Sequence, residues 1–378
     1  MSDVPFLPFA RPVLSEETYK EVEAVLRSGW LTTGPRVAQF EKDLSVYFDD
    51  RQVRTLSSAT AGLQLALLAL DLKPGDEVIT TPLTFVATLN TIVQAGGKPV
   101  LVDIDPNTRN MDANLLEAAI TKNTRVIMPV HFAGLPVDQE VVYDLASRYR
   151  LRVVEDCAHA IGAHYKSKKI GAYGDIQVMS FHPNKNMTTG EGGAVVTNDV
   201  TVIKRIEQLR FHGIDRNAFN RFSKTGSQHY DVVTPGFKYN MMDIQAAIGL
   251  HQLPMLDGFI KNRTKWAEKY RKRLAGINAI SLPEAPDYKH VHAWHLFTIL
   301  VPERDSFIDK MKEKNIGVGM HYVSAHLFSY YRKTFGFKPG DFPHAEKVGA
   351  HICSLPLFPD MQQSDLDRVV NAVQEVLA

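Results

Sequence analysis

The chain has 378 residues, well above the ~150 residues typical of one domain, so we expect two structural units or one large α/β unit. Hydrophobic residues at 44% and charged residues at 22% exclude a disordered or collagen-like chain, and 43 basic against 42 acidic residues leave a net charge of +1, which argues against a nucleic-acid partner. The only two cysteines, Cys157 and Cys353, cannot provide a disulfide framework and favour a reducing, cytoplasmic setting.

The N-terminal part of the chain predicts two helices and no export signal. Residues 1–12 lack a basic stretch followed by a long apolar core, as a signal peptide would have. Residues 14–28 have helical spacing, with Ser15 as the expected N-cap, and residues 35–47 are helical again after a loop. The longest apolar stretch, residues 63–70, is far below the ~18 residues of a membrane span, so no membrane insertion is expected.

The middle of the chain alternates between strand and helix patterns. The expected helices include residues 60–70, 85–94 and 139–149. The expected strands are residues 77–81, 99–104, 125–131, 152–155, 176–181 and 194–197. This alternation predicts an α/β fold with a mostly parallel central sheet covered by helices on both faces. Ligands of such sheets bind at the carboxyl ends of the strands, so polar residues just after strands are the candidates for a site.

The C-terminal part changes character. Residues 206–238 form a polar, turn-rich excursion, and two helices follow at 242–256 and 262–274. Beyond them the patterns predict a smaller α+β unit, with strands at 294–301 and 318–322 and helices at 305–314 and 364–377. We therefore expect a large cofactor-binding domain over 1–255 and a small C-terminal domain over 256–378, with residues 1–30 packing on the small domain.

Asp156 and Lys185 are the most informative pair in the sequence. Each follows a predicted buried strand, and 29 residues separate them (185 − 156). Pyridoxal phosphate requires a lysine amine for its aldehyde and a carboxylate against its pyridine nitrogen, which an ionised aspartate keeps protonated. The pair therefore suits that cofactor. The alternative is that Asp156 caps a helix and Lys185 is a surface lysine.

Three further features suit the same cofactor. Ser58, Ala59 and Thr60 open a helix after a predicted strand, where free backbone N–H groups bind phosphate, although a plain serine N-cap gives the same pattern. Ser180 precedes Lys185 by five residues and could also reach a phosphate. Phe85 could stack on a flat ring or could be a core aromatic.

Other cofactors fit the sequence less well. No Gly-x-Gly-x-x-Gly turn opens a strand-helix unit, which argues against a nicotinamide-dependent dehydrogenase, and the glycines at 190–193 suit a tight turn rather than a nucleotide loop. His290 and His292 would share one face of a strand, but His295 would point to the other, and no metal site is expected. The cysteines are expected to be buried small side chains rather than nucleophiles.

At this point the chain resembles a known family. Ser-Phe-His-Pro-Asn-Lys at 180–185, followed by Gly-Glu-Gly-Gly at 190–193, is similar to the DegT/StrS-type nucleotide-sugar aminotransferases of the fold type I pyridoxal-phosphate class. The likeness covers nearly the whole chain. Its further segments are residues 28–35, 57–62, 75–79, 155–160, 210–213 and 238–240.

The resemblance implies a role for each matching residue. Lys185 would be the Schiff-base lysine and proton shuttle, Asp156 would pair with the pyridine nitrogen, and His159 would lie over the cofactor near its phenolic oxygen. Cofactor binding would also involve Ser58, Ala59, Thr60, Phe85, Ser180 and Asn240. Substrate contacts would come from Trp30, His321 and Tyr322. The expected role of Asn240 is to reach the phosphate of the neighbouring subunit, which implies a homodimer with shared active sites.

The resemblance also implies a substrate class. Residues 234–240, 290–297 and 352–361 are most similar to the branch that makes UDP-4-amino-4-deoxy-L-arabinose for lipid A modification, from which Phe85 and Asn184 depart. L-Glutamate would then donate its amine to a UDP-linked 4-keto-pentose. Members that act on UDP-, dTDP- or GDP-linked 4-keto-6-deoxy sugars carry similar motifs and remain an alternative. A non-catalytic, cofactor-bound sensor is a remote alternative, because no added DNA-binding segment is recognisable.

Overall fold

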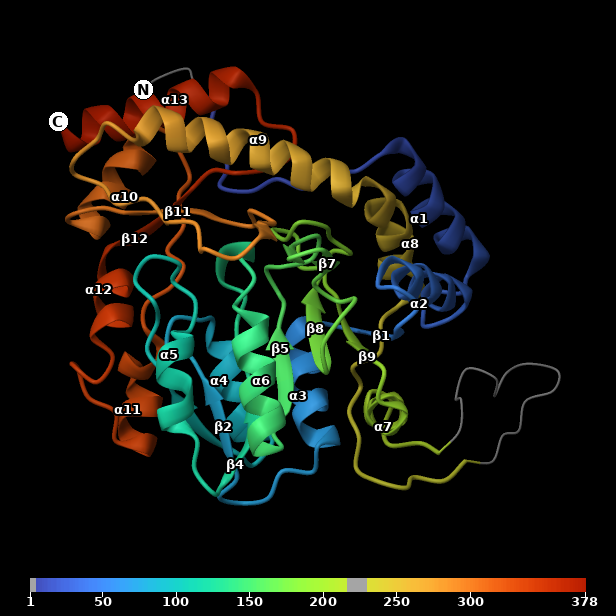
Figure 1. Cartoon of the computed structure of the whole chain (residues 1–378). Coiled ribbons are helices and arrows are strands. Elements are labelled where there is room, and N and C mark those ends of the chain that lie inside the picture. The colour runs from blue at the N-terminus through green and yellow to red at the C-terminus, as the bar shows by residue number, and fades with distance from the viewer. Residues whose placement is uncertain (1–4, 216–229) are drawn as a thin grey trace.

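The centre of the fold is a seven-stranded sheet with one antiparallel strand. The computed structural model describes residues 5–215 and 230–378, and Figure 1 shows helices packed around the sheet. Its strand order is β1–β9–β8–β5–β4–β2–β3, and only β9 runs antiparallel to its neighbours. The strands are β1 (Gln52–Leu56), β2 (Glu77–Thr80), β3 (Lys98–Leu101), β4 (Thr124–Ile127), β5 (Arg152–Asp156), β8 (Ile176–Ser180) and β9 (Gly193–Thr197). The predicted fold class, a mostly parallel α/β sheet, is confirmed.

Both faces of the sheet are buried because successive strand residues enter different hydrophobic clusters. Val78 and Val126 pack with α3 (Ala59–Ala69) and α7 (Val200–Leu209) on one face. Their neighbours Ile79 and Ile127 pack with α6 (Gln139–Tyr149) on the other. Side chains of a strand alternate between the two faces, so helices must cover each of them. Further helices before α9 are α2 (Pro35–Tyr47), α4 (Val86–Gln94), α5 (Ala113–Leu116) and α8 (Asp243–Gln252).

The helical predictions hold with shifted boundaries. α1 (Glu16–Ser28) begins after Ser15, whose hydroxyl accepts the Thr18 N–H and so confirms the predicted N-cap. The two helices expected at 242–256 and 262–274 are α8 and α9 (Leu256–Leu274), with a short 3-10 turn between them. That turn contains Pro254, which has no N–H to continue the helical ladder. The polar excursion at 206–238 begins later than expected, since α7 reaches Leu209, and residues 216–229 lie outside the described residues.

The C-terminal part builds a second core on a two-stranded sheet. β11 (Phe297–Leu300) pairs antiparallel with β12 (Ile352–Leu355), and α9 packs against α13 (Gln363–Leu377) across the top of Figure 1. Leu7, near the start of the described chain, belongs to this core and pairs with Ile316. The other helices here are α10 (Arg304–Glu313), α11 (Ser329–Phe335) and α12 (Pro343–His351). No helix among the described residues is long and apolar enough to cross a membrane.

One predicted strand of this region is wrong. Residues 318–322 form no strand, and only Gly319 pairs with Ser354 of β12. Past that bridge the His321 Nδ1 atom lies 2.9 Å from the Ser354 hydroxyl, and the chain turns toward the large sheet. The side chains of His321 and Tyr322 thereby reach the site described below.

The two expected domains share more contacts than a simple division suggests. β10 (His290–Val291) pairs with β6 (His164–Tyr165), which in turn pairs with β7 (Lys168–Lys169). Tyr331 of α11 donates a hydrogen bond to Asn90 of α4. The boundary near residue 255 and the packing of residues 1–30 on the small domain stay predictions.

Candidate functional site

A cavity of about 310 Å³ lies where the central strands end. Asp156 and Ser180 are the last residues of β5 and β8, which lie side by side in the sheet, and Ser58 follows β1 by two residues. The volume suits a small-molecule cofactor. Ten of the residues singled out in the sequence line this cavity: Ser58, Ala59, Thr60, Phe85, Asp156, His159, Ser180, Lys185, His321 and Tyr322.

Asp156 is held by two hydrogen bonds at the floor of the cavity. Its Oδ2 accepts from the Thr88 hydroxyl at 2.8 Å, and its Oδ1 accepts from the Ala158 N–H at 3.1 Å. Burial raises the pKa of the Asp156 carboxyl, although these two hydrogen bonds and the nearby Lys185 act to lower it. A cationic ring nitrogen placed against Asp156 would favour its ionised form in the same way as Lys185 does.

Lys185 is half-buried and lines the cavity, so it is not the surface lysine of the alternative interpretation. Burial lowers its pKa to about 8, although Asp156 acts in the opposite direction. Its Nζ lies 3.4 Å from Nε2 of His295. The neighbouring Asn186 donates to the Ala293 carbonyl at 2.7 Å, which ties the two segments together. An amine with a pKa near neutrality can act as nucleophile, acid or base.

One end of the cavity offers donors for a phosphate. Ser58 is the N-cap of α3, and its hydroxyl accepts the Ala61 N–H. The N–H groups of Ala59 and Thr60 have no acceptor among residues 5–215 and 230–378, and they lie at the positive end of the helix dipole. A Cβ on Gly193 would lie 2.5 Å from the Ala59 nitrogen, so glycine lets β9 approach this turn closely. These features fit the phosphate of pyridoxal phosphate.

Aromatic and imidazole rings form the wall around the cavity. Phe85 is 55% exposed and lies 5.9 Å from the Tyr322 ring, so one of its faces is open to a flat ligand rather than buried in the core. His159 accepts the Ala133 N–H at Nδ1, which leaves Nε2 to donate to the Tyr322 oxygen at 3.1 Å. Burial lowers the pKa of His159 well below its usual range and that of His321 to about 4, so both rings are neutral at physiological pH.

Two of the predicted site residues lie outside the cavity. Asn240 donates from Nδ2 to the Thr33 hydroxyl at 2.6 Å, and Trp30 donates from Nε1 to the Thr33 carbonyl at 3.1 Å. Trp30 and Thr33 line a separate open pocket. Trp30 and Asn240 therefore share a contact with Thr33, and neither lines the cavity that Lys185 lines.

Sequence reasoning missed two residues that contact the central pair. Thr88 donates a hydrogen bond to Asp156. The sequence signal for Thr88 was its position on α4, one turn after Thr84 and close to Phe85, the predicted ring-stacking residue. His295 lies against Lys185, but the sequence indicated it only as a possible metal ligand and as part of the family-like segment 290–297. No local pattern joins His295 to Lys185, because 110 residues separate them.

The histidines at 290–295 point to different partners. The His290 Nδ1 atom lies 2.9 Å from the Tyr288 carbonyl. His292 accepts the Trp294 N–H at Nδ1 and stacks on the Trp294 ring. His295 faces Lys185. The three imidazoles thus face different partners, and the absence of a metal site there stays a prediction.

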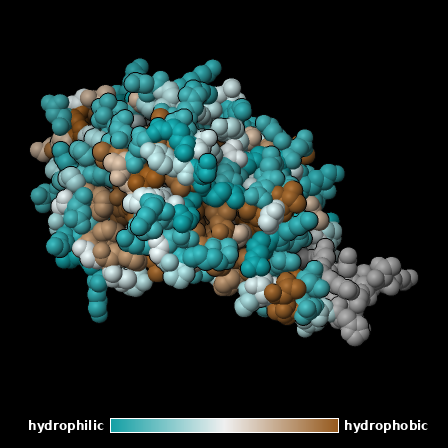
Figure 2. Space-filling model, turned by 60° about the horizontal axis from the view of Figure 1, so that its bottom comes forward, coloured by the Kyte–Doolittle hydropathy of each residue, from teal (hydrophilic) through white to brown (hydrophobic). Residues whose placement is uncertain are grey.

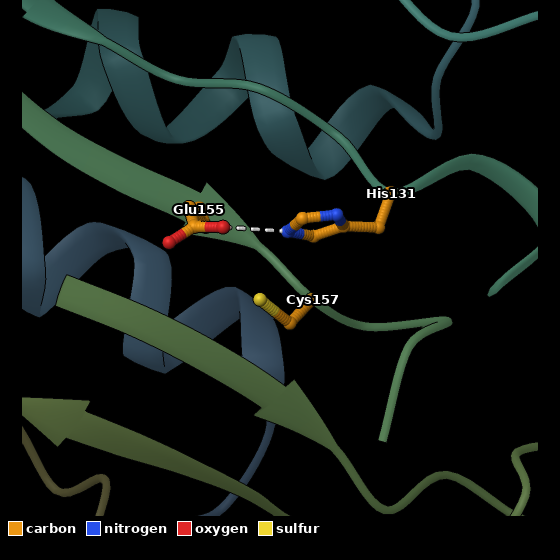
Figure 3. Close-up of side chains that lie close together, drawn as sticks. All are labelled: His131, Glu155 and Cys157. Atoms are coloured by element: carbon orange, nitrogen blue, oxygen red, sulfur yellow. Dashed lines mark hydrogen bonds and ion pairs between the residues drawn. The ribbon is translucent and has the colours of Figure 1, made fainter. Parts of the chain in front are cut away.

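A second buried cluster, His131, Glu155 and Cys157, lies around β5 and has metal-binding residue types (Figure 3). The imidazole of His131 and the carboxylate of Glu155 already have hydrogen-bond partners within the protein. His131 accepts the Val137 N–H at Nδ1, so its Nε2 donates to Glu155 at 2.8 Å. Glu155 also accepts hydrogen bonds from Gln139 and Tyr143. The imidazole has no free lone pair, so the cluster fits a structural role that fixes the strand carrying Asp156.

Three comparisons with known proteins bear on this arrangement. The model of the DegT/DnrJ/EryC1/StrS aminotransferase family matches residues 12–374. The chain is 42% identical to the spore coat polysaccharide biosynthesis protein SpsC of Bacillus subtilis, covering 98% of this chain and 97% of the relative. It is also 42% identical to the UDP-4-amino-4-deoxy-L-arabinose–oxoglutarate aminotransferase of Shewanella sediminis, covering 98% of each.

A solved structure agrees in fold and cofactor. The putative sugar aminotransferase Spr1654 of Streptococcus pneumoniae superposes with a TM-score of 0.91 in its PMP form at 33% identity, covering 98% of this chain and 99% of that one. The same protein has been solved in its PLP form, with a TM-score of 0.90.

Proposed function

Because this chain belongs to the DegT/DnrJ/EryC1/StrS aminotransferase family and is a pyridoxal phosphate-dependent sugar aminotransferase, we propose that it moves the amino group of L-glutamate to the 4-keto group of a nucleotide-linked sugar. The preferred acceptor in this proposal is a UDP-linked 4-keto-pentose, whose product is used in lipopolysaccharide or lipid A modification, and the reaction takes place in the cytoplasm. The observation that carries the assignment of the site is the half-buried Lys185, whose amine has a pKa of about 8, in one cavity with Asp156.

Lys185 and Asp156 have the central roles in the proposal. Lys185 would hold the cofactor through its Nζ and, when released, would take a proton from the substrate carbon and return it at the next step. When bound, pyridoxal phosphate supplies a ring that accepts the electron pair left on that carbon. Asp156 would keep the ring nitrogen protonated, and Thr88 would keep the carboxylate in place. A lysine pKa near neutrality supports both directions of proton transfer.

The other residues would bind and orient. The first turn of α3 (Ser58, Ala59 and Thr60) and Ser180 would hold the phosphate through N–H and hydroxyl groups. Phe85 would stack on the ring, and His159, whose Nε2 carries its proton, would donate to the phenolic oxygen. His321 and Tyr322 line the same cavity and would contact the sugar nucleotide.

Trp30 and Asn240 support a homodimer with shared sites. Both contact Thr33, and neither lines the cavity that holds Lys185, so in the proposal they would reach the cavity of a second copy. Leu31 and Met242 are exposed next to them, at 42% and 43%. The space-filling view also shows apolar patches among polar residues on the lower face (Figure 2). Exposed apolar side chains of this kind favour a protein partner.

The choice of sugar rests on the relatives. The Shewanella relative is named for the UDP-4-amino-4-deoxy-L-arabinose reaction, which supports the UDP-pentose. SpsC is equally similar but is named for spore coat polysaccharide biosynthesis and not for that reaction, so the relatives do not single out the pentose and a 4-keto-6-deoxy sugar stays the second candidate.

An amino-transfer assay tests the proposal. L-Glutamate would be supplied with UDP-, dTDP- and GDP-linked 4-keto sugars, and 2-oxoglutarate and the amino sugar would be measured. We expect turnover with the UDP-4-keto-pentose to exceed that with each 6-deoxy sugar. A higher rate with a 6-deoxy sugar would replace the proposed acceptor, and full activity of Lys185→Ala would overturn the role of the lysine.

A further inference from the structure

The imidazole of His295 has an unusual environment. It is buried, with 2% of the residue exposed, and its Nδ1 has no hydrogen-bond partner in the described part of the chain. Its other nitrogen, Nε2, lies 3.4 Å from the Lys185 amine. A buried polar ring with one unpaired nitrogen costs stability compared with an apolar side chain. In the described part of the chain, the contact with Lys185 is therefore the one polar contact that the ring makes.

The backbone around His295 is fixed on two sides. Arg263, fully buried on α9, donates from Nη1 to the carbonyls of Trp294 and Leu357. On the other side, the N–H of Ala293 donates to the Gly134 carbonyl. This anchoring limits how far the imidazole can move away from Lys185. The contact is thus a fixed feature of the fold and not the chance position of a surface side chain.

The turn at residues 132–134 links His295 to the rest of the cavity. The N–H of Leu296 donates to the Ala133 carbonyl, and the N–H of Ala133 donates to His159. The His159 and His295 rings lie 4.3 Å apart between centroids. One short turn therefore sets the position of both imidazoles relative to the cavity.

Only a neutral His295 can accept a hydrogen bond at Nε2. Burial lowers the pKa of His295 well below its usual range, and the positive charge of Lys185 lowers it further. The other charged or titratable groups around this pair are Asp156 from β5, His159 after β5, His321 from the loop before α11, and Arg263 from α9. Asp156 is the one that favours the charged form of the lysine.

We propose that His295 is a positioning residue that accepts a hydrogen bond from the ammonium form of Lys185 and so holds the proton on Nζ between its uptake and its return. The inference rests on the proposed function, in which Lys185 carries that proton. The proton stays on Nζ throughout, and the imidazole contributes only its lone pair. A separation of 3.4 Å is long for such a bond, and catalytic hydrogen bonds commonly tighten when ligands bind.

The test measures the basicity of Lys185 in the full-length protein freed of cofactor. Pyridoxal phosphate is added over a range of pH, and its condensation with the amine, which releases water, is followed by absorbance. The rate depends on the neutral amine, so its pH profile reports the pKa of Lys185, expected at about 8. Borohydride reduction and peptide mass analysis identify the lysine that reacts.

Four variants separate a positioning role from a structural one. His295→Leu removes the acceptor, so we expect the profile to move down by about one pH unit, as the loss of a hydrogen bond to a charged group implies. His295→Gln places an amide oxygen near the Nε2 position and should restore the wild-type profile, whereas His295→Asn is too short and should resemble the leucine variant. His292→Leu lies in the same segment, has no contact with Lys185 in the described structure, and should leave the profile unchanged.

The outcomes are distinguishable. An unchanged profile in His295→Leu and His295→Asn, or an equal shift in His292→Leu, overturns the role of His295. If His295→Leu does not fold by circular dichroism, the comparison of the glutamine and asparagine variants decides the question. If the wild-type protein does not attach pyridoxal phosphate at Lys185, the proposed function fails instead.

Discussion

Thr88→Val offers the sharpest test of how the fold controls Asp156. The two side chains are nearly the same size, and the change removes only the hydroxyl that donates to Asp156 at 2.8 Å. Thr84 lies 2.8 Å from the same hydroxyl, so the wild-type carboxylate ends a chain of two hydrogen bonds. The variant leaves the Ala158 N–H as the remaining hydrogen bond to the carboxylate among the described residues.

The magnitude follows from the charge on the acceptor. A hydrogen bond to a charged group contributes about 1.5–3 kcal/mol. One pKa unit corresponds to about 1.4 kcal/mol, so the loss raises the pKa of Asp156 further, by about one to two units. This change adds to the upward shift that burial already causes. A protonated Asp156 cannot hold a cationic ring nitrogen, so pyridoxal phosphate should bind about tenfold more weakly or worse at pH values below the raised pKa.

The assay is the dissociation constant of pyridoxal phosphate, measured by absorbance from pH 5.5 to 9. We expect the acidic limit of binding to move up by about one pH unit or more in Thr88→Val. Thr91→Val is the matched control, because Thr91 is also buried on α4 but donates to the Thr88 carbonyl. Equal affinities and equal pH profiles for the two variants would refute the reasoning.

Three further predictions concern stability and the cofactor. Because burial raises the pKa of Asp156, its ionisation destabilises the cofactor-free protein as pH rises through that pKa. Asp156→Asn should therefore raise the melting temperature at pH 7.5 but not near pH 4, while the rate of amino transfer falls at least about a hundredfold. An unchanged melting temperature at both pH values would contradict this reasoning. Glu155→Leu leaves two buried donors and one half-buried donor without their acceptor and should lower the free energy of unfolding by about 3 kcal/mol or more in urea titrations. A loss below about 1 kcal/mol would show that the cluster is not structural. Gly193→Ala forces a methyl group toward the Ala59 nitrogen and should lower the free energy of unfolding by about 1–3 kcal/mol and weaken pyridoxal phosphate binding. Gly258→Ala is the control, because this glycine of α9 has open space where the methyl group would lie, and the change should be neutral or stabilising. Equal behaviour of the two variants would be inconsistent with the close approach of β9 to α3.

The sequence predicted most of the fold because the relevant signals are local. Alternating apolar runs and helical spacing indicated the elements of the central sheet, and Ser15 indicated the start of α1. Asp156 could be selected as a site candidate because it follows a predicted strand, and parallel strands end at one edge of a sheet. Ser180 could be selected because it precedes Lys185 by five residues. The strand expected at 318–322 failed for a tertiary reason, since Gly319 alone pairs with β12 before the chain turns into the site.

Tertiary structure alone decided how these candidates are surrounded. It placed Thr88 on the Asp156 carboxylate and His295 against Lys185, contacts between residues 68 and 110 positions apart. It also left Trp30 and Asn240 outside the cavity that the other predicted site residues line. Periodicity reports which face of an element is buried, but not which distant side chain it meets. The sequence therefore determined the chemistry that this site can perform, and packing determined the burial and the partners that set the charge states of Asp156 and Lys185.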